Sequence, residues 1–180
     1  MAKAERRAID KVFILLGVAV TAVLLVVGAL SWYGYTFATG NVRSELSAQK
    51  IYFPEKGSPA LDPAVYPDLQ KYAGQQVDDG IKAKAYANGY IGRHLDKIGG
   101  GKTYAEISAE AMKDPTNQVL QQQKQSLFQG ETLRGMLLGN GYAFWVFGIL
   151  AKYAAITAFA GAAITAVLVW LGLRHLAKLK

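Results

Sequence analysis

The stretches VFILLGVAVTAVLLVVGALSW, residues 12–32, and YAAITAFAGAAITAVLVWLGL, residues 153–173, decide the fold of this chain. Each contains 21 residues and no charged side chain. An α-helix rises about 1.5 Å per residue and the hydrocarbon core of a bilayer is about 30 Å thick, so each stretch is long enough to cross it. The sequence therefore predicts an all-α membrane protein with a two-helix transmembrane hairpin and a helical insert between the two spans.

The rest of the chain divides into two short tails and the insert. We expect a tail at 1–11, a first transmembrane helix at 12–33, an insert at 34–142, an interfacial segment with the second transmembrane helix at 143–173, and a tail at 174–180. Two starting points fit the second transmembrane helix, near 143 and near 153. The ambiguity arises because Lys152 interrupts the apolar run and a lysine near a span reaches for the headgroups.

The charges of the tails predict the orientation. Seven of the 20 Lys and Arg residues and two of the 13 acids lie in the tails, so the tails carry +5 of the net charge of +7. Short basic segments beside a span stay in the cytoplasm. We therefore expect both termini to be cytoplasmic and the insert to lie on the extracytoplasmic side of the plasma (inner) membrane. The basic charge is concentrated in the tails and not in the insert, which argues against a nucleic-acid partner.

The first apolar run is interpreted as a retained anchor. It is longer than the about 7–15 apolar residues of a signal peptide, and no small-x-small cleavage site follows it. The chain contains no cysteine, which excludes disulfides, zinc–thiolate sites and iron–sulfur clusters. We expect no cofactor and no metal.

Aromatic and basic residues flank the spans where a bilayer has its interfaces. Trp and Tyr favour the headgroup layer because the ring is apolar and its polar atom stays hydrated. The predicted membrane-interface anchors are Trp32, Tyr33, Tyr35, Trp145, Lys152, Trp170 and Arg174.

Small residues recur at fourfold spacing in the second span. The stripe consists of Ala154, Ala158, Ala162 and Ala166, with Gly161 beside it. Small side chains let two helices approach closely in lipid. Two interpretations remain open: an interface with a partner or a second copy, and packing against the first span, which offers Gly17, Thr21 and Gly28.

The insert is predicted to be helical. Residues 41–50 continue the first helix, and a proline-containing loop follows. An apolar helical pattern then runs from about Pro67 to Ile98 and ends at Gly99–Gly101. Thr103 and Glu106 are expected to form a capping box for a helix to about Met112. Asp114-Pro115 is expected to start the next helix, which runs to Leu138, with a kink at 139–141.

The motifs that suggest chemistry have structural explanations. Gly99–Thr103 lacks the first glycine of a phosphate-binding loop, since Asp96 occupies that position, and it follows a predicted helix where the loop needs a strand. The two histidines, His94 and His175, lie on opposite sides of the predicted membrane. The acids at Asp78, Asp79, Asp96 and Glu106 lack the spacing of a calcium loop. No catalytic residue is predicted.

Several short segments resemble one family. They are the residues around Leu46–Ile51, Gly100–Glu106 and Thr132–Leu138 leading into Ala143-Phe144. Together they are similar to small two-span actinobacterial membrane proteins that often carry the automatic label "aromatic ring-opening dioxygenase". The resemblance implies an uncharacterised integral membrane protein of a Gram-positive-type envelope. The enzymatic label does not transfer, because the ligands of such an oxygenase are missing.

The sequence thus favours a non-catalytic membrane protein. We expect an accessory, assembly or stabilising subunit of a larger membrane complex that acts through its extracytoplasmic helical domain. Its expected partners are the bilayer and other membrane-protein subunits or itself. A homo-oligomeric scaffold or pore, and a metal- or lipid-binding envelope protein, are the alternatives.

Overall fold

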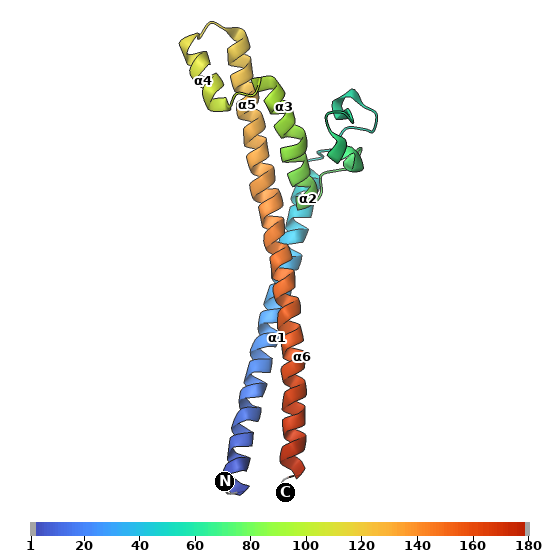
Figure 1. Ribbon diagram of the computed structural model, residues 1–180, viewed down its shortest axis with the longest axis vertical. Helices are drawn as coiled ribbons and strands as arrows, with labels where there is room; N and C mark the ends of the chain where they lie inside the picture. Colours follow the sequence, from blue (N-terminus) through green and yellow to red (C-terminus); the bar gives the residue numbers. More distant parts are fainter. Residues whose placement is uncertain (1–2, 179–180) are drawn as a thin grey trace. The chain divides into compact units, whose positions relative to one another are not determined.

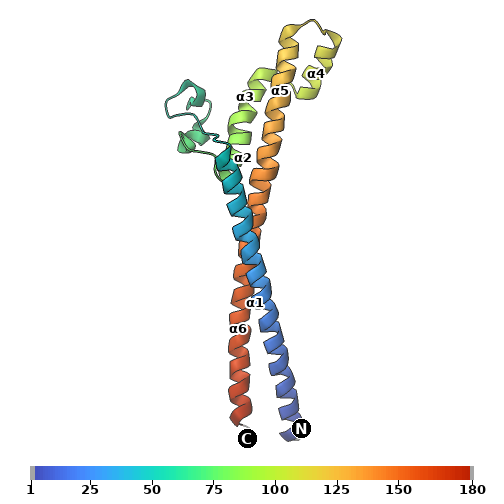
Figure 2. The same ribbon diagram turned by 180° about the vertical axis from the view of Figure 1, so that it is seen from behind.

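The structure, a computed structural model, describes residues 3–178. This part of the chain is all-helical and contains no strand, and two of its helices are long and apolar enough to cross a membrane. It divides into two compact units (Figures 1 and 2). The span unit comprises the described residues up to Phe37 together with those from Gly148 on, and the insert unit comprises Ala38–Phe147.

The helices occur in the order that the sequence predicts, with short 3-10 and π segments between them. Their bounds are α1 (Lys3–Ala48), η1 (Pro59–Leu61), η2 (Pro67–Tyr72), α2 (Gly80–Lys84), η3 (Ala85–Ile91), α3 (Gly92–Gly99), α4 (Tyr104–Lys113), α5 (Gln118–Met136), η4 (Leu137–Ala143) and α6 (Phe144–Lys178).

In the span unit, α1 and α6 lie side by side and antiparallel (Figures 1 and 2). The hydroxyl of Thr21 donates a hydrogen bond to the hydroxyl oxygen of Thr165 over 2.8 Å, which fixes the register of the two helices. On one side of this pair, a Cβ added to Gly17 would lie 2.6 Å from Val169. Gly17 therefore leaves the space that the Val169 side chain of α6 occupies.

The buried or half-buried positions of the span unit alternate at spacings of three and four. On α1 they are 7, 10, 14, 17, 21, 24, 28, 31 and 35 (with 34 beside the last), and on α6 they are 148, 151, 155, 158, 162, 165, 169, 172 and 176, with 149, 152 and 161 beside them. This is the heptad spacing that keeps one seam of each helix against its partner. The other positions expose large apolar side chains such as Leu15, Val26 and Leu171.

The core of the insert unit forms where a loop folds back onto helices α2, η3 and α3. Phe53, Leu61, Leu69 and Val77 are almost fully buried there. The ring of Phe53 stacks on Tyr72 with centroids 5.2 Å apart and meets Tyr86 edge-on at 5.1 Å. Such aromatic contacts add to the stabilisation that burial of the rings supplies.

The predicted helical pattern over 67–98 is wrong for its first part. Residues 67–72 form the 3-10 helix η2, and the chain is then non-helical up to Asp79, whose side chain caps α2. The reason is a non-local pairing: the amide of Phe53 donates to Gln75 and the amide of Val77 donates to Ile51. Leu69 thus reaches the core from η2, and Val77 reaches it from the non-helical segment that follows.

Three other predicted helix boundaries differ in outcome. Gly100 ends α3 in the left-handed conformation (φ 60°), and Thr103 and Glu106 form the capping box of α4, so both predictions are confirmed. The start at Asp114-Pro115 is wrong. Asn117 caps α5, because its side chain accepts a hydrogen bond from the amide of Leu120.

The position of the expected kink at 139–141 lies in a π-helical turn, η4. Segment η4 joins α5 to α6, and the helical stretch is continuous from Gln118 to Lys178. The second span therefore begins inside a helix, and both expected starting points, near 143 and near 153, lie on it. A Cβ added to Gly141 would lie 3.0 Å from the Cβ of Ala83, so the glycine lets α2 approach η4 closely.

Candidate functional site

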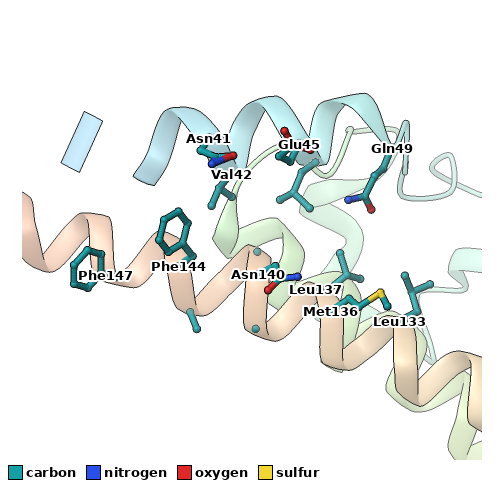
Figure 3. A pocket seen from close by; sticks show the side chains of 14 residues that line it. Asn41, Val42, Glu45, Gln49, Leu133, Met136, Leu137, Asn140, Phe144 and Phe147 are labelled. Atoms are coloured by element: carbon teal, nitrogen blue, oxygen red, sulfur yellow. The ribbon is translucent and has the colours of Figure 1, made fainter. Parts of the chain in front are cut away.

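The insert unit has a groove between the end of α1 and the stretch from α5 to the start of α6. Its volume is about 760 Å³, within the range of about 300–1,000 Å³ that is usual for ligand pockets. Figure 3 shows the side chains of the two helical walls facing one another. The groove is lined by Asn41, Val42, Glu45, Leu46, Gln49, Leu133, Met136, Leu137, Gly139, Asn140, Gly141, Ala143, Phe144 and Phe147.

One wall of the groove is apolar. Leu133, Met136 and Phe147 are large side chains that remain exposed, with Met136 and Phe147 each 59% accessible. Leu137 is buried beneath them. Exposed apolar side chains that line a concave surface mark a binding site more often than scattered ones do.

The opposite wall is polar along one stripe. Asn41, Glu45 and Gln49 follow one another at fourfold spacing on α1, which places them on one face of that helix. All three are exposed. Within residues 3–178, no side-chain hydrogen bond or ion pair engages them. The groove is therefore amphipathic, with a free carboxylate and two free carboxamides on one side.

The π-helical turn shapes the apolar wall. Segment η4 contributes Leu137, Gly139, Asn140, Gly141 and Ala143 to the groove. π-Helical turns inside α-helices occur frequently at functional sites, because the extra residue re-aims the side chains around it. Here the two glycines leave the wall without side chains next to Asn140.

A second exposed surface lies on the helical pair α4–α5. The rings of Tyr104 and Phe128 are 5.8 Å apart, and Phe128 is 57% accessible. Gln121, Lys124 and Gln125 border a hollow of about 370 Å³ beside them. We call these five residues the aromatic ledge. The positions 121, 124, 125 and 128 share one face of α5.

The predicted small-residue stripe lies only partly on the packed seam. Ala158 and Ala162 are buried between the two helices, together with Ala155. A Cβ on Gly161 would lie 3.3 Å from Leu24 of α1. Ala154 and Ala166 are exposed, because the seam alternates by three and four residues and a strict fourfold series drifts off it. An interface with a partner stays a prediction.

The predicted membrane-interface anchors of the span unit form aromatic contacts. Trp32 meets Tyr35 edge-on at 5.4 Å, and the ammonium of Lys152 lies 5.4 Å from the Tyr35 ring. The Arg174 guanidinium lies 4.6 Å from the Trp170 ring. Cations over aromatic faces are attracted by the ring quadrupole.

Two further anchors have different surroundings. Tyr33 is well exposed and stacks on Phe37. Trp145 packs against Gly80 at the start of α2 and borders the core of the insert unit. The membrane-anchor role of all seven residues stays a prediction.

The acidic residues named from the sequence mostly serve local structure. Asp79 caps α2, Asp78 pairs with Lys82, and Glu106 accepts hydrogen bonds from the amide and hydroxyl of Thr103, which lower the pKa of Glu106. Asp96 is exposed at the end of α3 and His94 is exposed on the same helix. Among the described residues, no group of three or more His, Asp or Glu is placed to hold a metal ion.

An ion pair and a tyrosine cluster complete the electrostatics of the insert unit. The Arg93 guanidinium donates to the Asp68 carboxylate over 2.7 Å and holds the pKa of Asp68 below its usual range. Burial raises the pKa of Tyr86 and Tyr90.

In the span unit, a cavity of about 420 Å³ has Asp10 and His175 among its lining residues. The sequence had suggested no link between these two residues, which come from opposite ends of the chain.

The groove was missed from the sequence. Its signals are the polar series at 41, 45 and 49 directly after the first span and the Gly-Asn-Gly at 139–141, but nothing in the sequence says that the two segments face each other. Comparisons with protein-family models, curated proteins and solved structures found no match to this chain.

Proposed function

We propose that this chain is a non-catalytic integral membrane protein of the plasma membrane that serves as an accessory, assembly or stabilising subunit of a larger membrane complex. Its two spans anchor it, its tails lie in the cytoplasm, and its insert docks onto a partner on the extracytoplasmic side.

The outer surface of the span unit supports insertion into a bilayer. Only 6% of the most apolar window of the first long helix and 17% of that of the second are buried inside the protein. A core helix of a soluble protein would be mostly buried. In this unit, small residues such as Ala158 and Ala162 are buried between the two helices. Many large apolar side chains are exposed on the outer surface, which is favourable in lipid.

The use of three acidic residues named from the sequence supports a non-catalytic role. The carboxylates of Asp78, Asp79 and Glu106 are engaged in an ion pair, an N-cap and a capping box. A catalytic acid or base needs a carboxylate that is free to reach a substrate.

The aromatic ledge is the observation that carries the docking proposal. Interfaces are enriched in exposed aromatic side chains surrounded by polar groups, and aromatic residues supply much of the binding energy. Tyr104 and Phe128 expose such rings, and the ledge's two glutamines and lysine provide the polar rim.

The test is purification of the tagged full-length chain from native membranes in mild detergent, with mass spectrometry of co-eluting proteins. We expect a stoichiometric membrane-protein partner with the wild type, and a loss of about tenfold or more with Phe128→Ala, since an interface hot spot contributes about 2 kcal/mol or more. Val119→Ala is the matched control, because Val119 is exposed on α5 outside the ledge. Elution of the wild-type chain alone would contradict the proposal.

A further inference from the structure

The groove in the insert unit combines features that fit one class of ligand. Its apolar wall exposes Leu133, Met136 and Phe147, while its polar wall presents the Asn41, Glu45 and Gln49 side chains. A ligand that satisfies both walls must have a polar part and an apolar part. A purely apolar ligand would desolvate the polar groups of the groove without replacing their hydrogen bonds to water.

The free polar groups indicate the headgroup chemistry. Glu45 is a carboxylate with no ion pair to any residue in 3–178, so it favours a cation. The carboxamides of Asn41, Gln49 and Asn140 provide N–H donors that suit a phosphate oxygen. A zwitterion with an ammonium and a phosphate matches this set, whereas a purely anionic headgroup would place its charge beside Glu45.

The path of the helices supports a ligand that comes from the bilayer. Phe147 precedes the apolar run at Tyr153 by six residues of the same helix, about 9 Å of helix axis. On α1, the first groove residue, Asn41, follows the aromatic end of the first span by one helical turn beyond Phe37. Along each of the two helices, the groove residues therefore lie within a few turns of the apolar run in the sequence.

We propose that this groove binds a phospholipid with a primary-amine headgroup, of the phosphatidylethanolamine type. The ammonium donates to Glu45, the phosphate accepts from the carboxamides, and an acyl chain lies along Leu133, Met136 and Phe147. The proposal rests on the membrane placement proposed above, but not on the existence of a partner subunit.

The experiment is native mass spectrometry of the full-length protein in detergent, titrated with phosphatidylethanolamine or with phosphatidylglycerol of the same acyl chains. We expect wild type to bind phosphatidylethanolamine about tenfold more tightly than phosphatidylglycerol. Glu45→Gln should reduce this preference to about twofold or less. Glu55→Gln is the charge-matched control, because Glu55 is exposed in the insert unit but does not line the groove.

A second pair of variants tests the apolar wall. Met136→Gln should weaken the binding of both lipids by about fivefold, because it replaces an apolar side chain of the groove with a polar one of similar size. Met112→Gln should leave binding unchanged, since Met112 is 69% exposed on α4, away from the groove. Both substitutions keep a good helix former at an exposed position, so folding is preserved.

The outcomes separate this proposal from the proposed function. Equal affinity of wild type for the two lipids, an unchanged preference in Glu45→Gln, or equal effects of Met136→Gln and Met112→Gln would each overturn the lipid site. A polypeptide that occupies the groove, shown by its loss on Met136→Gln in the co-purification, would overturn it as well. Loss of the partner in Phe128→Ala with lipid binding intact would support both proposals independently.

Discussion

The seam between α1 and α6 yields the sharpest prediction. Ala162 and Ala166 are one helical turn apart on α6 and share the predicted fourfold stripe, yet Ala162 is 3% exposed in the seam and Ala166 is exposed. Substitution of either by leucine adds the same isopropyl group. Only Ala162→Leu should therefore disturb the packing of the two helices.

The expected size follows from the closeness of the helices. Ala162 is 3% exposed, and at the neighbouring Gly161 a Cβ would already lie 3.3 Å from Leu24 of α1, so we expect a leucine at 162 to overpack the seam. Overpacking of a well-packed site costs about 1–3 kcal/mol, which is about 5- to 150-fold in an equilibrium constant. Ala166→Leu should change the equilibrium by about twofold or less, as exposed substitutions do.

The assay measures disulfide formation between two introduced cysteines, which is possible because the chain has no cysteine of its own. Thr21→Cys and Thr165→Cys replace two hydroxyls that are 2.8 Å apart, and the effective concentration of the two thiols is measured in detergent with a permeant dithiol buffer. A protease site at the exposed Gly57 reveals the disulfide as two linked fragments on a gel. Ala162→Leu should lower the effective concentration by the factor given above. Equal decreases for Ala162→Leu and Ala166→Leu would refute the seam.

Three further predictions concern the insert unit. Gly130→Ala should be destabilising by about 1–3 kcal/mol in denaturant titrations, because its Cβ would collide with the buried Leu95 side chain, whereas Gly135→Ala on the same helix meets open space and should be neutral or stabilising. Thr103→Ala should lower the free energy of unfolding by about 1 kcal/mol through loss of the α4 N-cap, with Thr103→Ser largely restoring it; equal stabilities of the two variants would contradict the cap. Burial raises the pKa of Tyr86, so its stabilising contribution is fully present below the unfolded tyrosine pKa of about 10 and is lost as the pH rises through the higher folded-state pKa. Unfolding measured from pH 9 to 11 should therefore show a shallower decline in Tyr86→Phe, and an unchanged slope would count against this.

Much of the fold could be predicted from the sequence because the signals are local. The length of an apolar run determines whether a helix can span a bilayer, and the end of α3 and the capping box of α4 each lie within a few consecutive residues. The wrong start at Asp114-Pro115 was also a local inference. Asp114 and Asn117 are both residue types that cap helices, and they lie three positions apart. Only the Asn117 side chain accepts a hydrogen bond from a free amide at the start of the helix.

Only the tertiary structure decided the features that depend on residues far apart in the chain. The loop after η2 is non-helical because residues 75 and 77 pair with residues 53 and 51. Ala162 lies in the seam and Ala166 lies outside it, because the buried positions of α6 recur at spacings of three and four residues. The groove exists because residues 41–49 face residues 133–147. Spans and caps are thus properties of contiguous sequence, whereas a loop path, a packed face and a binding groove arise from the pairing of segments, which a single sequence does not specify.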